Sequence, residues 1–246
     1  MVHPDQRRQG IGSELCDVLL AELETIQAAS LQARVWEDRA DSLRFLQKRG
    51  FVEIHRMYEL RLAVQQADWS PFTALPERLA VHGIEITTLQ KEAEDPTCWR
   101  KLTDLQNSAM PDWPDPDPNA ITTMYSVDEF RRMFASWRMM PNAFFIAKAR
   151  GRYVGYSGLG IEDQATEAIG EGIGSGPTAV RPEYRNLGVA TSLKLLSLNC
   201  ARQLGYAVAH SRSANPAMLR VNEKLGFVRG HAEVRLVKRL EEDRHD

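Results

Sequence analysis

The chain has 246 residues, of which 43% are hydrophobic and 26% are charged, an ordinary composition for a globular protein. Its 31 basic and 33 acidic residues give a formal net charge of −2, which excludes the global basic surface of a nucleic-acid-binding protein. No apolar run approaches the ~18 residues of a membrane span, and the first residues lack the basic and apolar regions of a signal peptide.

The three cysteines, Cys16, Cys98 and Cys200, are an odd number without a close pair. They therefore indicate neither a disulfide framework nor a zinc site. We predict a reduced, soluble, cytoplasmic protein that holds no metal and binds neither nucleic acid nor a membrane.

Hydrophobic periodicity predicts alternating helices and strands in the first 62 residues. The expected elements are a helix over 10–28, a strand over 31–36, a helix over 38–48 and a strand over 51–62. Residues 63–82 contain Pro71 and Pro76 and form the predicted linker, with one short helix at 77–81.

The second part of the chain begins with a predicted strand over 84–89 and a helix over 96–110. The pair Ser126 and Glu129 has the spacing of a capping box, which predicts a helix to about Met140. Further along the chain we expect strands at 143–149, 152–161, 168–180, 207–213 and 227–240, and helices from 187 or 188 and over 216–224. The predicted domains are 1–62 and 83–240, joined by the linker 63–82 and followed by the charged tail 241–246.

A loop rich in proline and aspartate separates the helices at 96–110 and 126–140. Asp112, Asp115 and Asp117 surround Trp113 in it, and this arrangement favours a cationic amine as ligand. A rigid, solvated loop is the alternative interpretation, because proline and aspartate are also typical of such loops.

Residues 180–191 are predicted to contain a strand end, a tight turn with Gly188 and the start of a helix. A helix start leaves about four backbone N–H groups unpaired and carries a partial positive charge, so it is a ready anion site. Gly188 has no side chain where a phosphate would approach.

Much of this stretch recurs near the N-terminus. Arg7 and Arg185 lie 178 positions apart, and Gly50 and Gly226 lie 176 apart, so residues 1–62 match residues 180–240. The first copy has no counterpart of 84–179, so either it is a half-domain or the sequence begins late. Its parallel strand would then have an open edge. Either the linker or a partner chain is expected to cover that edge, and the second alternative predicts a homodimer.

The motif Arg-x-x-Gly-x-Ala at 185–190 precedes a helix, and Asn-x-x-Met-Leu-x-x-Asn-x-x-Leu-Gly-Phe follows at 215–227. Together they resemble the acetyl-coenzyme A (acetyl-CoA) signature and the last helix of the GNAT superfamily of N-acetyltransferases. The duplication is similar to that of tandem-GNAT enzymes. The resemblance implies an α+β fold, an α/β sandwich with a mixed, largely antiparallel twisted sheet flanked by helices.

The resemblance also implies which residues hold the coenzyme. The backbone near 179–180 would pair with the pantetheine arm, the N–H groups of 185–191 would hold the pyrophosphate, and Asn215 would lie near the pantetheine. The implied cofactor-binding residues are Ala179, Val180, Arg185, Asn186, Leu187, Gly188, Val189, Ala190, Thr191 and Asn215.

Acetyl transfer to an amine requires a base that takes a proton from the acceptor. The family often uses a Glu on the fourth strand, and the resemblance implies Glu171 for this role; a solvated strand carboxylate is the alternative interpretation. The family commonly places a Tyr four residues before the glycine of Gly-Phe, as general acid. Asn222 stands there, which predicts a hydrogen bond to the thiolate sulfur and no donated proton.

We therefore predict an acetyl-CoA-dependent N-acetyltransferase that acts on a primary amine of a small molecule by direct attack in a ternary complex. The first alternative is a non-catalytic acyl-CoA-binding sensor or scaffold, which the missing Tyr and the half-size first copy suggest. The second is a transferase of a longer acyl group. The first copy is predicted to bind acetyl-CoA weakly or not at all.

Overall fold

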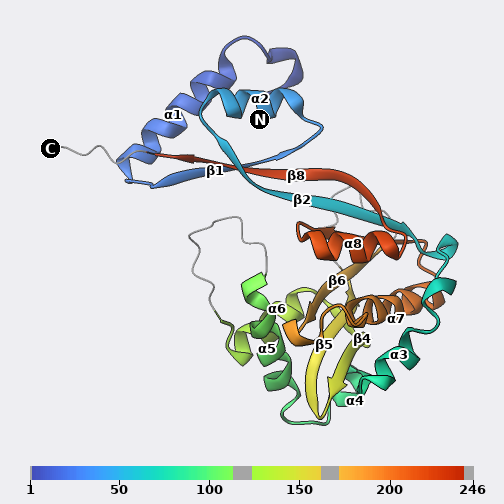
Figure 1. Ribbon diagram of the computed structural model, residues 1–246. Helices are drawn as coiled ribbons and strands as arrows, with labels where there is room; N and C mark the ends of the chain where they lie inside the picture. Colours follow the sequence, from blue (N-terminus) through green and yellow to red (C-terminus); the bar gives the residue numbers. More distant parts are fainter. Residues whose placement is uncertain (1, 113–123, 162–171, 241–246) are drawn as a thin grey trace. The chain divides into compact units, whose positions relative to one another are not determined.

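The structure is a computed structural model that describes residues 2–112, 124–161 and 172–240 (Figure 1). The chain divides into a small compact unit, Met1–Arg56 with Glu233–Asp246, and a large one, Met57–Ala232. The described residues form eight strands in the order β1-β8-β2-β7-β6-β5-β4-β3. Among these residues, no helix is long and apolar enough to cross a membrane.

The large unit contains a mixed sheet flanked by helices. Its strands, in spatial order, are β2 (Val52–Ala63, from Met57 onward), β7 (Val208–Ser213), β6 (Gly172–Val180), β5 (Arg152–Gly160), β4 (Met139–Ala149) and β3 (Ile84–Thr88). Its helices are α3 (Leu75–Val81), α4 (Leu89–Glu92), α5 (Cys98–Ala109), α6 (Val127–Ser136), α7 (Val189–Gln203) and α8 (Pro216–Lys224). Neighbouring strands are antiparallel except for the parallel pair β6–β7. The predicted fold class is confirmed.

One helix boundary was predicted wrongly. The capping box of Ser126 and Glu129 is present at the start of α6, but the helix ends at Ser136 and not near Met140. Arg138 has a φ of 45°, a left-handed conformation that interrupts the helix. The chain then enters β4 at Met139, four residues before the predicted strand start.

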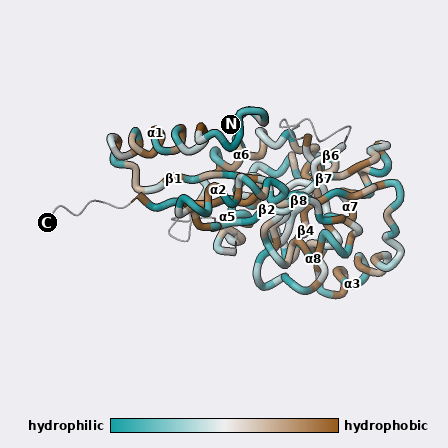
Figure 2. The backbone as a smooth tube through the Cα atoms, turned by 90° about the horizontal axis from the view of Figure 1, so that it is seen from above, coloured by the Kyte–Doolittle hydropathy of each residue, from teal (hydrophilic) through white to brown (hydrophobic). Residues whose placement is uncertain are grey.

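The small unit contains α1 (Ile11–Thr25), β1 (Ser30–Trp36), α2 (Ala40–Lys48) and the end of β8 (Val228–Arg239). β1 pairs with β8 in antiparallel register from Ser30 with Arg239 to Trp36 with Glu233. Phe51, Val234 and Leu236 form its buried core. Polar and apolar residues are interspersed along α1 (Figure 2), and several of its apolar side chains are exposed.

The sequence repeat is also a structural repeat. At an offset of 178, the 15-residue helix α1 corresponds to the 15-residue helix α7, and the 3₁₀ helix Pro4–Gln6 corresponds to Pro182–Tyr184. At an offset of 176, α2 corresponds to α8 and β2 to β8, with equal lengths in each pair. The predicted tandem repeat is confirmed.

The two copies exchange their last strands. β1 of the first copy pairs with β8 of the second, and β7 of the second copy pairs with β2 of the first. The registers are equivalent, because the pair of Ser30 and Arg239 corresponds to the pair of Val208 and Ala63. Each compact unit is therefore completed by a strand from the other copy. The domain boundaries drawn from the repeat stay a prediction.

Helix α7 packs closely against the sheet of the large unit. A Cβ at Gly155 on β5 would lie 2.8 Å from Val189 Cγ1 and 3.1 Å from Leu193 Cδ1. Only a glycine therefore allows the first turns of α7 to lie this near the strand. The contact fixes the N-terminus of α7 beside the first half of β5 and the end of β6, where Gly155 pairs with Val180 and the predicted anion site lies.

Candidate functional site

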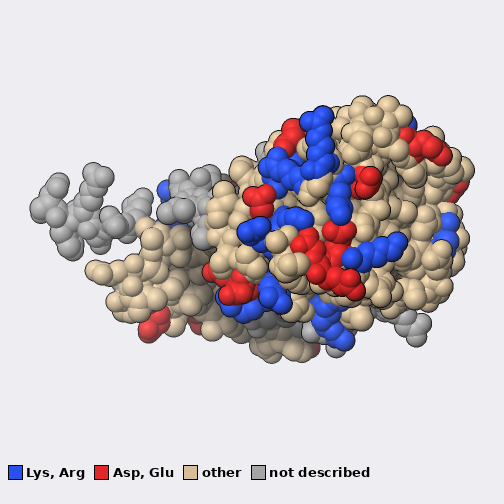
Figure 3. All heavy atoms as spheres, turned by 90° about the horizontal axis from the view of Figure 1, so that it is seen from below, with Lys and Arg blue, Asp and Glu red and all other residues tan. Residues whose placement is uncertain are grey.

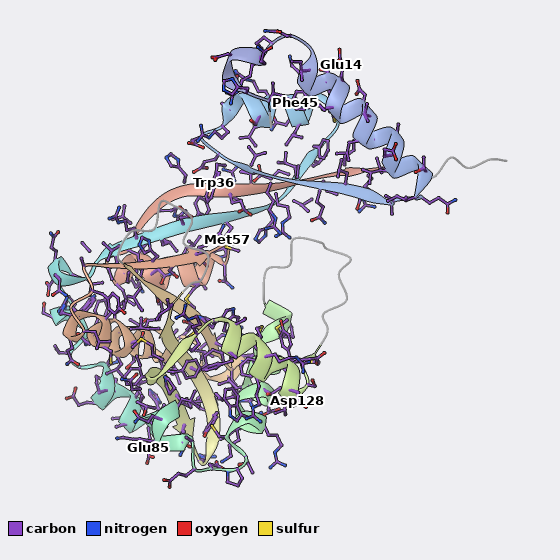
Figure 4. All side chains as sticks on the ribbon, turned by 180° about the vertical axis from the view of Figure 1, so that it is seen from behind. Glu14, Trp36, Phe45, Met57, Glu85 and Asp128 are labelled. Atoms are coloured by element: carbon purple, nitrogen blue, oxygen red, sulfur yellow. The ribbon has the colours of Figure 1, made fainter. Side chains whose placement is uncertain are left out.

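A cleft of about 510 Å³ opens in the large unit beside the N-terminus of α7. Its walls come from the end of β6, the turn 184–188, the first turns of α7, the end of β7 and one face of α8. Met57 of β2, labelled in Figure 4, also lines it. The cleft thus lies between elements on both sides of the parallel strand pair β6–β7.

The floor of the cleft is a gap between two parallel strands. β6 and β7 pair at three positions, the last being Gly174 with His210. β6 continues to Val180 and β7 to Ser213, with no further ladder pair between them in the described chain. The register of β6 against β5 also shifts between Ser175 and Thr178, and such a bulge bends a strand. The strands therefore splay apart and leave backbone groups for an extended ligand.

Arg181 anchors the turn that follows β6. Its side chain is only 3% exposed, its Nε donates to Tyr153 O at 2.8 Å, and its guanidinium forms an ion pair with Asp104. Its backbone N–H donates to Val154 O at 2.9 Å. A buried arginine with these partners holds the turn against β5 and leaves the following residues facing the cleft.

The turn itself has the backbone of an anion cradle. Asn186 and Gly188 have φ values of 63° and 91°, and Gly188 is the N-cap of α7. No hydrogen bond among the described residues uses the amides of Val189, Ala190 or Thr191, the first three of the helix. These donors and the positive end of the helix dipole suit a phosphate group.

The charge of the cleft agrees with this geometry. Its basic lining residues are Arg185, Lys194, Arg212, Arg220 and Lys224, and no aspartate or glutamate of the described chain lines it. Elsewhere on the protein the signs mix, since basic and acidic side chains are interspersed on the face shown in Figure 3. The cleft therefore fits a polyanionic ligand such as a coenzyme diphosphate.

Nine of the ten predicted cofactor-binding residues line the cleft, and Leu187 of the same turn does not. Asn215 lines it while capping α8, because its Oδ1 accepts from the amides of Ala217 and Met218 at 2.9 and 3.2 Å. The nine are Ala179, Val180, Arg185, Asn186, Gly188, Val189, Ala190, Thr191 and Asn215.

Of the two predicted catalytic residues, the structure describes only Asn222, which is not among the residues that line the cleft. Glu171 is outside the described residues, as are Trp113, Asp115 and Asp117 of the acidic loop. Asn222 is fully buried on α8, and neither its Oδ1 nor its Nδ2 has a hydrogen-bond partner. Both catalytic roles stay predictions.

Sequence reasoning missed Lys194. This lysine lies in the second turn of α7, lines the cleft and is 1% exposed. Its Nζ donates to Ser175 Oγ at 2.8 Å. Burial lowers the pKa of the ammonium to about 8. The only signal in the sequence was its position between Ala190 and Leu198 on one apolar stripe of the helix.

The equivalent turn of the first copy has the same backbone and different chemistry. Gly10 has a φ of 89°, close to that of Gly188. Glu14, labelled with Phe45 in Figure 4, corresponds to Ser192 and places a carboxylate in the first turn of α1. Phe45 corresponds to Val221, and its ring lies 3.7 Å from where a Cβ of Gly12 would be. An acidic group and a larger side chain both disfavour a phosphate ligand there.

Comparisons with known proteins agree with the site. The sequence profile described as "Acetyltransferase (GNAT) family" matches residues 1–51 and 99–227. Among curated relatives, a mycothiol acetyltransferase of Amycolatopsis mediterranei is 26% identical over 243 residues, covering 95% of this chain and 72% of that protein. A mycothiol acetyltransferase of Geodermatophilus obscurus is 25% identical over 241 residues, covering 95% and 71%.

Solved structures share the fold. A GCN5-related N-acetyltransferase from Sphaerobacter thermophilus matches with a TM-score of 0.68 and 17% identity, covering 98% of this chain and 72% of that one. A tandem GNAT protein from the clavulanic acid biosynthesis pathway matches with a TM-score of 0.64 and 18% identity, covering 99% and 74%. At sequence identities of 17% and 18%, the similarity of these two structures to this chain shows a shared fold only.

Proposed function

Because this chain belongs to the acetyltransferase (GNAT) family, we propose that it transfers the acetyl group of acetyl-CoA to a primary amine of a small molecule. The family and the relatives indicate an N-acetyltransferase. The observation that carries the proposal is the cleft, whose described lining is basic and has no carboxylate, and which contains a glycine cradle and two splayed strands.

Each part of the cleft has a role in this proposal. The amides of Val189, Ala190 and Thr191 hold the pyrophosphate, and Arg185 and Arg212 contribute positive charge. The pantetheine arm lies between β6 and β7 and uses the backbone groups that the splay leaves unpaired. Bound there, acetyl-CoA supplies an activated acetyl thioester. The cleft aligns this group with the acceptor for direct attack in a ternary complex.

The acceptor is proposed from the relatives' names. Two relatives are called mycothiol acetyltransferases, so we propose a small polar amine of that kind, with the deacetylated form of mycothiol as the first compound to test.

Thiol release from acetyl-CoA, measured over a panel of small amines, is expected to increase with one class of amine. Coenzyme binding with no turnover on any amine would instead support the sensor or scaffold. Competition between acyl-CoA thioesters tests the longer acyl group.

Glu171 is our proposed base, on the resemblance described above. Its replacement by glutamine is expected to lower kcat/KM about 100-fold near neutral pH. The loss should shrink as the pH rises, because a larger fraction of the acceptor amine is then already deprotonated. Rates of the parent and Glu171→Gln across a pH series measure this. An unchanged pH profile would refute the role of Glu171.

A further inference from the structure

Lys194 is a buried amine inside the proposed acetyl-CoA cleft. Its residue is 1% exposed, and its Nζ lies 5.9 Å from the ring centre of Phe227. The ammonium has three N–H donors. Ser175 Oγ accepts one at 2.8 Å, and no hydrogen bond of the described chain uses the other two. A buried charge with two unused donors is costly unless a ligand completes its surroundings.

The position of Lys194 along the gap indicates which part of the coenzyme it meets. Ser175 follows directly after the last β6–β7 pair, Gly174 with His210, so Lys194 lies at the closed end of the splay. The phosphate cradle lies at the other end, five residues along β6 at Val180, a span of about 16 Å for an extended strand. A ligand with its diphosphate in the cradle and its arm along β6 brings its far end to Lys194. In acetyl-CoA that end carries the thioester.

The charge state of Lys194 suits proton donation. Its pKa falls to about 8 through burial, with no charged neighbour contributing. The other charged residues of the described chain that line the cleft are Arg185, Arg212, Arg220 and Lys224. Arg185 is held at the cradle end, where its Nε donates to Val180 O at 3.1 Å. An acid with a pKa near the working pH is protonated before the reaction and readily gives its proton away.

We propose that Lys194 is the proton donor to the departing sulfur of coenzyme A. The acceptor nitrogen forms a bond to the acetyl carbon, the carbon–sulfur bond breaks, and its electron pair goes to sulfur. The sulfur takes a proton from Lys194 Nζ, which leaves coenzyme A as a thiol and the lysine neutral. The acceptor nitrogen loses its own proton to the base, and Lys194 regains one from solvent when the product leaves. This inference rests on the proposed function.

The first test needs no acceptor. Coenzyme A is bound to the full chain, and the ultraviolet absorbance of its thiolate is followed against pH. The Lys194 ammonium is expected to lower the pKa of the bound thiol by about 1 to 3 relative to Lys194→Met. Lys91→Met, which removes an exposed lysine of α4, should behave like the parent. A parent that does not bind coenzyme A would refute the proposed function; equal thiol pKa values in the parent and Lys194→Met would refute only the role of Lys194.

The second test separates charge from proton donation during turnover. Lys194→Met should lower kcat about 100-fold or more and remove an alkaline decline of kcat centred near pH 8. Lys194→Arg keeps the charge but cannot release a proton, so it should keep the low thiol pKa and still lose kcat. Thermal unfolding verifies that each variant is folded. Parent-like kcat in Lys194→Met, or an acetyl group on Lys194 by mass spectrometry during turnover, would overturn the proposal.

Discussion

Replacing Gly188 with valine is expected to raise the Kd for acetyl-CoA about 100-fold or more, which corresponds to about 2.8 kcal/mol. Gly188 has a φ of 91°, and a Cβ there would lie 3.0 Å from Leu75 Cδ2. A β-branched residue is strained by about 1–2 kcal/mol in the left-handed region. The turn would therefore leave this conformation, and the amides of Val189, Ala190 and Thr191 would no longer converge on one phosphate. Calorimetric titration at fixed ionic strength measures the change.

The first copy supplies a matched control for this substitution. Gly10→Val introduces the same side chain at a φ of 89°, so its backbone strain is comparable. We expect one equivalent of acetyl-CoA per chain and an unchanged Kd in this variant, because Glu14 and Phe45 disfavour a phosphate at that turn. Two equal sites in the parent, or weaker binding in Gly10→Val, would contradict the prediction that only the second copy binds.

The sequence predicted those features that depend on neighbours along the chain. The helix periods and the glycine after α2 are local signals, and together with the constant offsets of 178 and 176 they placed α1, α7, α2 and α8 correctly. The cradle could be located for the same reason, since its glycine, its small residues and its helix start are consecutive. The predicted C-terminal end of α6 was wrong because nothing in the sequence requires the left-handed conformation of Arg138.

Features that depend on tertiary packing were not predictable from the sequence. The alternation of apolar and polar residues along β2 and β8 is the same whether each strand pairs within its own copy or with the other copy. The sequence pattern therefore cannot predict that β1 pairs with β8 and β7 with β2. A lysine on a helix is ordinarily exposed, yet α7 contacts the sheet and also α3 and α8. The buried surface of α7 is therefore wider than a single apolar stripe, and it includes Lys194. The burial of Asn222, a polar residue of α8, likewise depends on tertiary packing.

Asn222→Leu is expected to stabilise the protein by about 1 kcal/mol or more. Asn222 is fully buried, and both polar atoms of its side chain lack partners. A buried polar group without a hydrogen bond costs about 1–3 kcal/mol. Leucine has the same number of side-chain heavy atoms and the same branch point, and the neighbouring Leu225 and Phe227 are buried and apolar. Denaturant unfolding should show a higher midpoint with an unchanged slope.

The same substitution at Asn107 should have the opposite effect. Asn107 lies on α5 of the same unit, where its Nδ2 donates to Tyr125 O and its Oδ1 accepts from Tyr125 N, both at 2.9 Å. Asn107→Leu leaves both backbone groups of Tyr125 unpaired and should lower the free energy of unfolding by about 1–3 kcal/mol. If both variants are destabilised alike, the side chain of Asn222 has partners in solution, and the argument from its burial is wrong.

Turnover of Asn222→Leu then separates the two candidates for the departing sulfur. If Lys194 donates the proton, kcat should stay within about threefold of the parent, because Asn222 is not among the cleft-lining residues and its side-chain amide has no hydrogen-bond partner. If Asn222 hydrogen-bonds the thiolate, as the sequence predicts, kcat should fall at least about tenfold while stability rises. A higher free energy of unfolding together with a lower kcat would indicate that the Asn222 amide acts in the reaction. Its hydrogen-bond partner would then be present only in the reacting complex.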